Sequence, residues 1–388
     1  MDDIRAERLN RLPRYLFVEI DRLKEAALRA GRDVIDLGVG DPDLPTPEFI
    51  VSRMREAVAD AAHHRYPSTR GSSAFRQAAA RFLQRRFDLS LDPDRQILSL
   101  IGTKEGIGHL PLALVNPGDV VLVPDPGYPV YRSGAVLAGA DVHSIPLKAT
   151  RGFLPALDEI PTNVARRARL MWLNYPNNPT SVEAPPSFFE EAVAFARQFD
   201  LTIAQDAAYS EVYTGKPPAS ILQVPDALDV AVELHSLSKT FNMTGWRVGF
   251  AAGRAEALAA LAEVKNNLDS GVFGAIQEAA ITALDGFDRP EVREIVQTYR
   301  RRRRVLVDAL IAAGWWVQRS GATFFVWARC PEGEDSASTA RRLLEEAAVV
   351  AIPGRGFGES GEGYVRFALT VAEERLAEAG RRIGRIRW

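Results

Sequence analysis

Short apolar runs alternate with amphipathic stretches along most of the chain, and the two patterns predict different elements. Apolar runs too short for a helix predict buried strands at residues 35–38, 97–101, 119–124, 170–173, 201–205, 229–235, 324–327 and 364–368. Apolar residues at helical spacing predict helices at 15–30, 47–60 and 288–313, in a segment that ends at Phe87 and in one centred on Leu343. Thr46 is expected to cap the helix at 47–60. Strands that alternate with helices predict an α/β protein with a mainly parallel sheet.

The stretch HSLSKTFNMTGWRVGF, residues 235–250, places several polar groups directly after one of these strands. Serine hydroxyls and the Arg247 guanidinium at this spacing form a plausible phosphate cradle, because charged hydrogen bonds to an anion are stronger than neutral ones. Lys239, beside that cradle, is placed to form a Schiff base with a carbonyl cofactor. The pattern alone also fits a solvated loop lysine among serines that cap a helix.

A second anion-binding pattern occurs at residues 102–104, where a predicted strand runs into Gly-Thr-Lys at the start of a helix. The first N–H groups of a helix have no partner within the helix and carry a partial positive charge. Residues 102–104 would therefore form the other half of a phosphate cradle.

The composition is ordinary for a soluble globular protein, with 388 residues, of which 46% are hydrophobic and 25% charged. A formal net charge of −2 gives no global attraction to nucleic acid or to a membrane surface. The arginine run at 300–304 is expected to form the solvated face of a helix, because no aromatic residues are interleaved with it.

The numbers and spacing of cysteine and histidine residues bear on disulfides and metal sites. Cys330 is the only cysteine, which excludes an intrachain disulfide and a cysteine-rich zinc site and fits a reducing compartment. The five histidines have no metal-ligand spacing and are expected to be structural. The charged N-terminal segment resembles no signal peptide, and no apolar run reaches the roughly 18 residues of a membrane span, so a cytoplasmic location is expected.

SLSKTFNMTGWRVGF resembles the pyridoxal-phosphate lysine motif of the class I and II aminotransferases, enzymes of fold type I. The resemblance covers nearly the whole chain, and matching residues occur in the family's order from Gly40 to Arg366. It implies pyridoxal 5'-phosphate as cofactor, a large α/β domain at 46–282 and a smaller α+β domain formed by 1–45 and 283–388. It also implies a homodimer with both active sites at the interface.

The resemblance assigns roles around the cofactor. Lys239 would hold the cofactor as a Schiff base and then move the substrate's Cα proton as general base and acid. Asp206, held ionised, would keep the pyridine nitrogen protonated, and Tyr128 would stack on the ring. Asn178 and Tyr209 would hydrogen-bond the phenolic oxygen. The phosphate would be bound by Gly102, Thr103, Lys104, Ser236, Ser238 and Arg247, and by Tyr66 of the neighbouring subunit.

Three further residues are implied to contact the substrate. Arg366 would clamp the α-carboxylate as a fork, the Gly40 N–H would meet the same carboxylate, and Tyr15 would line the distal pocket. The family usually has glycine after the threonine of NYPNNPT, whereas this chain has Ser181, so the turn there is open to a different conformation.

Within the family the chain looks most like the LL-diaminopimelate aminotransferases, through segments such as LPRYLFVEIDRLKEAA and LDSGVFGAIQEAA. Related alanine–glutamate and aspartate aminotransferases share many of these residues. The expected reaction is therefore a ping-pong transfer of an amino group from LL-diaminopimelate, alanine, aspartate or glutamate to a 2-oxo acid such as 2-oxoglutarate. Two alternatives stay open: a carbon–sulfur β-lyase of the same fold, and a non-catalytic regulator with an aminotransferase-like domain.

Overall fold

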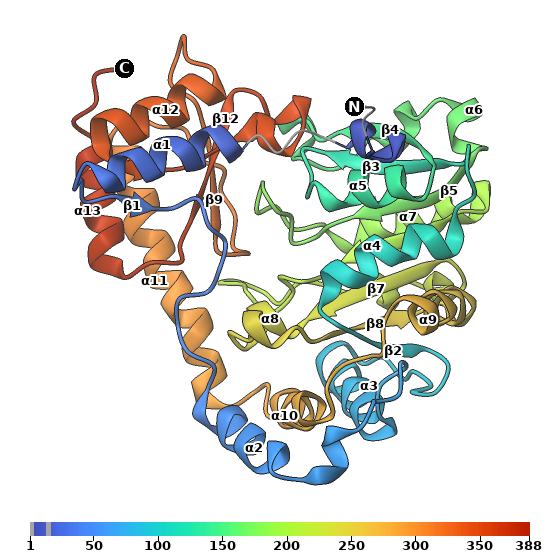
Figure 1. Ribbon diagram of the computed structural model, residues 1–388. Coiled ribbons are helices and arrows are strands. Elements are labelled where there is room, and N and C mark those ends of the chain that lie inside the picture. The colour runs from blue at the N-terminus through green and yellow to red at the C-terminus, as the bar shows by residue number, and fades with distance from the viewer. Residues whose placement is uncertain (1–3, 13–16) are drawn as a thin grey trace.

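The computed structural model describes residues 4–12 and 17–388, with helices on both faces of a large sheet and a second group of helices and strands beside it (Figure 1). The α-helices are α1 (Phe17–Arg29), α2 (Glu48–Val58), α3 (Ser73–Phe87), α4 (Thr103–Leu114), α5 (Val130–Leu137), α6 (Thr162–Ala165), α7 (Pro186–Phe199), α8 (Leu237–Thr240), α9 (Ala255–Leu268), α10 (Gly274–Asp285), α11 (Pro290–Ala312), α12 (Ser336–Ala347) and α13 (Glu373–Ile383). The strands are β1 (Ile35–Asp36), β2 (Ile97–Leu100), β3 (Val120–Asp125), β4 (Asp141–Pro146), β5 (Ala168–Leu173), β6 (Thr202–Asp206), β7 (Ala231–Ser236), β8 (Gly249–Gly253), β9 (Phe325–Arg329), β10 (Val349–Val350), β11 (Ile352–Pro353) and β12 (Tyr364–Ala368).

The large sheet has seven strands in the order β2-β8-β7-β6-β5-β3-β4. β8 is antiparallel to both of its neighbours, and the other pairs are parallel. The central strands are buried along nearly their whole length because helices cover both faces, which explains why they read as continuous apolar runs. The predicted α/β fold with a mainly parallel sheet is confirmed.

Each face of this sheet has its own core. Helices α3, α7 and α10 contribute to the core on one face, with α2 packed on α10, and α4, α5 and α9 contribute to the core on the other. Successive residues of one strand supply opposite faces: Met171 belongs to the first core and Trp172 to the second.

A second group of elements packs around a three-stranded sheet in the order β11-β12-β9, with α11, α12 and α13 against it. β1 pairs in parallel with β10, so the N-terminal segment joins this group (Figure 1). Residues as distant as Ile35 and Leu369 share its core. This arrangement suits the expected smaller domain, whose boundaries stay a prediction.

The strand directions place one set of loops at a single edge of the large sheet. β3, β5, β6 and β7 run parallel, so their C-terminal ends meet there. β8 runs the other way and begins at this edge, where Gly249 pairs with both Ser236 and Leu100. The segments after β2 and β7 and the segment before β8 therefore converge.

Two local expectations are wrong. Thr46 does not cap α2: its hydroxyl donates to the Asn242 carbonyl at 2.8 Å, and the N-cap position is Pro47. The arginine run is not wholly solvated, because Arg302 and Arg303 are only 4% and 9% exposed. Arg302 forms an ion pair with Asp43, and Arg303 donates to backbone carbonyls, so partners inside the fold offset the cost of burial.

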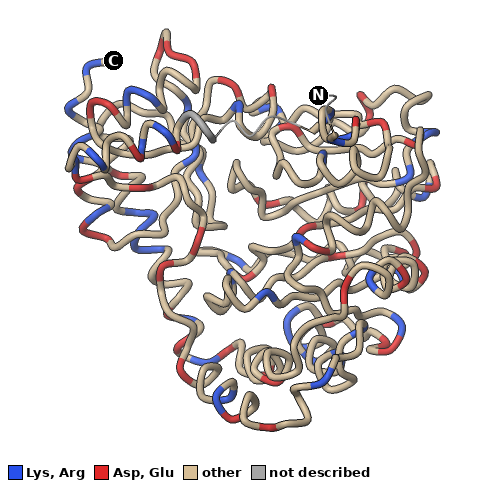
Figure 2. Tube along the Cα trace, in the orientation of Figure 1, with Lys and Arg blue, Asp and Glu red and all other residues tan. Residues whose placement is uncertain are grey.

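Basic and acidic residues are mixed along the described trace (Figure 2), in keeping with the small net charge of −2. Within the described ranges, no helix combines the length and the apolar character that a membrane crossing requires.

Candidate active site

Lys239 lies in α8, the short helix that follows β7 at the converging edge. Its Nζ donates to the Gly40 carbonyl at 3.0 Å and lies 5.5 Å from the centre of the Phe324 ring. Burial lowers the pKa of Lys239 to about 8, and the charge of Arg247 acts in the same direction. An amine with such a pKa is neutral in a substantial fraction at mildly alkaline pH and is then a nucleophile.

Gly102 and Arg247 form one side of a compact cationic corner. Gly102 has a φ of +72° directly before α4, and a Cβ built on it would lie 2.5 Å from Arg247 Nη2. Glycine suits this position because L side chains rarely adopt such a positive φ, and a Cβ here would displace the guanidinium. The guanidinium thus lies against the N-terminus of α4, where Thr103 and Lys104 present backbone N–H groups to an anion.

The serines of the lysine motif lie next to this corner. Ser236 ends β7 and caps α8 by accepting a hydrogen bond from the Ser238 N–H at 3.2 Å. Its strand partner is Gly249, and a Cβ on Gly249 would lie 3.5 Å from Thr103 Cγ2. The fold therefore brings both predicted halves of the phosphate cradle together.

Asp206 ends β6 as a buried carboxylate, 5% exposed. Its Oδ2 accepts from the Tyr131 hydroxyl at 2.7 Å, and its Oδ1 accepts from the Ala208 N–H at 3.2 Å. Burial raises the pKa of Asp206, and the Tyr131 hydrogen bond opposes that rise. Sequence reasoning missed Tyr131; the only signal was its position three residues after Tyr128, on the helix that follows β3.

Arg366, in β12, is a buried guanidinium that bridges distant parts of the chain. Its Nη1 donates to Asn178 Oδ1 and its Nη2 to the Gly38 carbonyl, both at 2.8 Å. Its Cζ lies 4.1 Å from the centre of the Phe325 ring. Burial lowers the pKa of Arg366 to about 10, and among the described residues no carboxylate forms an ion pair with it. Its Nε is buried without a partner, so the group is suited to receive an anion.

Aromatic rings line the space between these charges. Tyr209 packs edge-on against Phe324 and Phe325, with ring centres 5.4 and 5.5 Å apart. Burial raises the pKa of Tyr209, which keeps its hydroxyl protonated as a donor. Tyr128 lies edge-on to Tyr131 at 5.7 Å, beside the partner of Asp206.

The structure does not connect two of the predicted site residues, Tyr66 and Tyr15, to the side chains around Lys239. Tyr66 is 91% exposed, in the segment before α3. Tyr15 lies outside the described residues.

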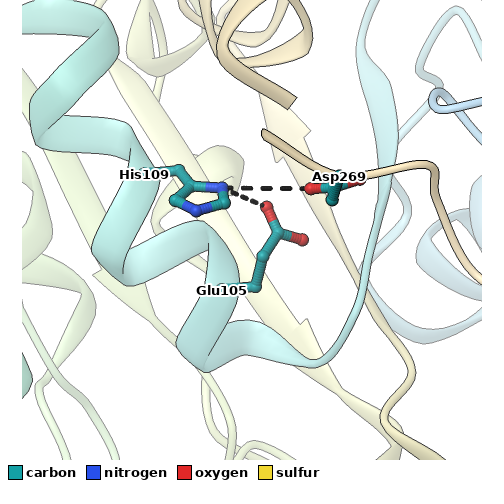
Figure 3. A group of neighbouring side chains, drawn as sticks. All are labelled: Glu105, His109 and Asp269. Atoms are coloured by element: carbon teal, nitrogen blue, oxygen red, sulfur yellow. Dashed lines mark hydrogen bonds and ion pairs between the residues drawn. The ribbon is translucent and has the colours of Figure 1, made fainter. Parts of the chain in front are cut away.

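Glu105 and His109 of α4 lie close to Asp269, which directly follows α9 (Figure 3). His109 Nδ1 lies 2.9 Å from Glu105 Oε1, four residues earlier on α4, so the prediction that no histidine has metal-ligand spacing is wrong for His109. The fully buried Lys265 ammonium lies 2.9 Å from Glu105 Oε2 and 3.1 Å from Asp269 Oδ2. Glu105 also accepts from the Ile101 N–H at 2.9 Å, directly before Gly102. This lysine supplies the positive charge that the carboxylates require, so the cluster braces the start of α4.

The residues present fit pyridoxal phosphate on three counts. The Gly102–Arg247 corner leaves backbone N–H groups and a guanidinium for a phosphate. Lys239 is an amine with a lowered pKa, suited to a carbonyl carbon. Asp206 is a buried carboxylate, and a cationic ring nitrogen would offset the burial that raises its pKa.

Comparisons with known proteins point the same way. The family model for aminotransferase class I and II matches residues 32–383. The chain is 53% identical to the LL-diaminopimelate aminotransferase of Aquifex aeolicus over 97% of this chain and 98% of that protein. Its structure is similar to substrate-bound BacF from Bacillus subtilis, with a TM-score of 0.94, 37% identity and 98% of both chains covered. It is also similar to a probable N-succinyldiaminopimelate aminotransferase from Thermus thermophilus, with a TM-score of 0.90, 38% identity, and 95% of this chain and 99% of that chain covered.

The family model matches almost the whole chain. The edge of the large sheet where the strands end holds an amine, a buried carboxylate and an anion-binding corner, which are the groups that pyridoxal phosphate requires. None of these matches favours a carbon–sulfur lyase. The chain belongs to the class I and II aminotransferases, pyridoxal-phosphate-dependent enzymes of fold type I.

Proposed function

We propose that this aminotransferase takes its amino group from LL-diaminopimelate and passes it to 2-oxoglutarate. One observation carries the assignment of the donor. Over nearly its full length, the chain is about half identical to proteins from several bacteria that are named LL-diaminopimelate aminotransferase. A buried arginine without a carboxylate partner among the described residues supports a substrate that carries an α-carboxylate.

The binding roles follow from the charges at the site. Arg366 receives the substrate α-carboxylate as a fork, and Asn178 and the Gly38 carbonyl hold the guanidinium in position. Gly40 offers its backbone N–H to the same carboxylate, beside the amine of Lys239. Residues 102–104, Ser236, Ser238 and Arg247 hold the cofactor phosphate.

When bound, pyridoxal phosphate supplies the reactive carbonyl and an electron-withdrawing ring that stabilises negative charge at the substrate Cα. Lys239, an amine with a pKa lowered to about 8, would take the proton from the substrate Cα as general base and give it back as general acid. Asp206 would keep the nitrogen of the cofactor's ring protonated, and Tyr131 orients that carboxylate by a hydrogen bond of 2.7 Å. Tyr128 would stack on the cofactor's ring, and Tyr209 and Asn178 would donate hydrogen bonds to its phenolic oxygen.

The assembly belongs to the same proposal. In the proposed homodimer, Tyr66 of one chain contacts the cofactor phosphate of the second copy, and its 91% exposure in the single chain supports this role because the side chain is available to a partner. Sedimentation of the holoenzyme should give twice the chain mass, and Tyr66→Phe should weaken cofactor binding without changing that mass. A cytoplasmic location accords with a single, buried cysteine.

The test uses purified holoenzyme and single amino acids without an acceptor, with the visible absorbance of the bound cofactor as the signal. LL-diaminopimelate should change this absorbance fastest, and 2-oxoglutarate should restore it. The meso stereoisomer is the matched control, because it differs only at one carbon. If alanine or aspartate reacts faster than LL-diaminopimelate, the donor assignment fails. Pyruvate released from cystathionine would indicate a lyase.

A further inference from the structure

Ser181 and Thr323 share an unusual backbone conformation. Both lie in the left-handed region, with φ of +64° and +61°. A β-branched residue is a marked outlier there, and such strain persists only where the surroundings impose it. Ser181 follows β5 and Thr323 precedes β9, so the two belong to different sheets.

Ser181 Oγ and Thr323 Oγ1 are 2.7 Å apart, and together with the backbone N–H and carbonyl of Phe325 they form a ring of hydrogen bonds. The Phe325 N–H donates to Thr323 Oγ1 at 3.0 Å, and Ser181 Oγ donates to the Phe325 carbonyl at 2.8 Å. Thr323 therefore donates to Ser181, and each bond polarises the next. Both side chains are buried, at 1% and 2% exposure.

Other contacts hold the strained residues in place. The Thr323 N–H donates to the Val212 carbonyl at 2.7 Å, and its carbonyl accepts from Arg303 Nη2 at 3.0 Å. Ser320 Oγ donates to the Ser181 carbonyl. Arg303, the buried arginine of α11, thus helps to hold the backbone at Thr323.

Phe325 connects this ring of hydrogen bonds to the substrate side of the site. Its aromatic ring lies 4.1 Å from Arg366 Cζ, and a Cβ built on Gly40 would lie 2.6 Å from Phe325 Cζ. Asn178, the partner of Arg366, lies three residues before Ser181 on the same loop. One hydroxyl pair therefore fixes both the loop that carries Asn178 and the ring that packs on Arg366.

We propose that Ser181 and Thr323 are positioning residues for the carboxylate clamp, setting the place of the Arg366 guanidinium between Asn178 and the Phe325 ring. This inference rests on the proposed role of Arg366. Neither hydroxyl touches the substrate; both act through Phe325. Loss of the pair lets the clamp shift, which weakens the hold on any substrate carboxylate and leaves the proton transfer at Lys239 unaffected.

The test measures succinate binding to the holoenzyme by calorimetry, because succinate offers carboxylates but no amino or oxo group to react. Ser181→Ala, Ser181→Gly and Thr323→Val should each weaken succinate binding by about 3- to 10-fold, the value of a neutral hydrogen bond. The same variants should raise KM for donor and acceptor by this factor and keep kcat within about 2-fold. Thr323→Ser, which retains the hydroxyl, should bind succinate as the wild type does.

Two comparisons separate positioning from general stability. Glycine at position 181 relieves the strained φ and alanine does not, so the urea midpoints of these variants should differ while their succinate affinities agree. Ser220→Ala removes another buried hydroxyl, which donates to Glu233 at 2.8 Å; it should lower the urea midpoint without changing succinate affinity. If the variants at 181 and 323 bind succinate like the wild type, the inference is overturned. If wild-type enzyme binds no succinate, the proposed role of Arg366 fails first and the inference with it.

Discussion

Tyr131 and Asp206 are joined by a 2.7 Å hydrogen bond across 75 residues of sequence, and the tyrosine ring is stacked on Trp172 with centres 5.0 Å apart. The stacking holds the hydroxyl in place, so Asp206 receives a donor whose position does not depend on any bound molecule. Burial alone would favour a neutral carboxyl, and this donor is the largest effect opposing it.

Tyr131→Phe tests this relationship. The ring stays in place, the hydrogen bond is lost, and the pKa of Asp206 rises further. We expect kcat/KM to fall by about 10- to 100-fold, since a hydrogen bond to a charged group contributes about 1.5–3 kcal/mol. Tyr175→Phe is the matched control, because its buried hydroxyl donates to the Phe153 carbonyl at 2.8 Å. Equal losses in both variants would show that the effect is not specific to Asp206.

Cofactor capture by the apoenzyme should depend on pH through Lys239. Burial lowers the pKa of this amine to about 8, and only the neutral amine attacks a carbonyl. The neutral fraction increases as pH rises through this pKa, so the association rate should climb and reach a plateau above pH 8. Stopped-flow absorbance measures the rate. A midpoint near the ordinary lysine pKa of about 10.4 would refute the assigned environment.

Arg366→Lys keeps a positive charge and removes the planar fork. A single ammonium cannot bind a carboxylate in a bidentate way, so kcat/KM should fall on the order of 10- to 100-fold for donor and acceptor alike. Arg301→Lys on α11, whose partners are Glu294 and Glu373, provides a surface control that should retain activity. A loss limited to one of the two substrates would argue against a shared carboxylate clamp.

Lys265→Met should destabilise the fold and weaken cofactor binding together. The methionine fills a similar volume but leaves Glu105 and Asp269 without the buried ammonium that lies within 2.9 and 3.1 Å of them. Breaking such a buried pair costs about 3–5 kcal/mol, which urea unfolding of the holoenzyme would detect. Lys148→Met removes a surface pair with Glu159 and should have little effect. An unchanged unfolding midpoint for Lys265→Met would contradict the bracing role.

The sequence allowed prediction of those features that depend on local pattern. Buried strands appear as apolar runs, and residues at or just after their C-terminal ends, such as Asp206 and Lys239, lie at one edge because parallel strands all end there. The partners that a side chain finds in distant segments could not be predicted from local pattern. Arg302 and Arg303 looked like surface residues because the ion pair with Asp43 and the accepting carbonyls come from distant segments. No pattern in the neighbouring sequence predicted that Ser181 would have a φ of +64°, in the left-handed region.

The bond from Arg366 to the Gly38 carbonyl spans 328 residues. A ribosome making this protein must therefore add 328 further residues after Gly38 before the two halves of the proposed clamp can meet. Nascent chains can build strands of the large sheet early, yet they cannot offer a finished place for an amino acid substrate. Closure across so long a stretch of sequence is entropically costly and slow compared with local helix formation. A newly made molecule therefore cannot acquire the proposed carboxylate clamp before Arg366 has been synthesised, and products of synthesis interrupted before that residue lack it.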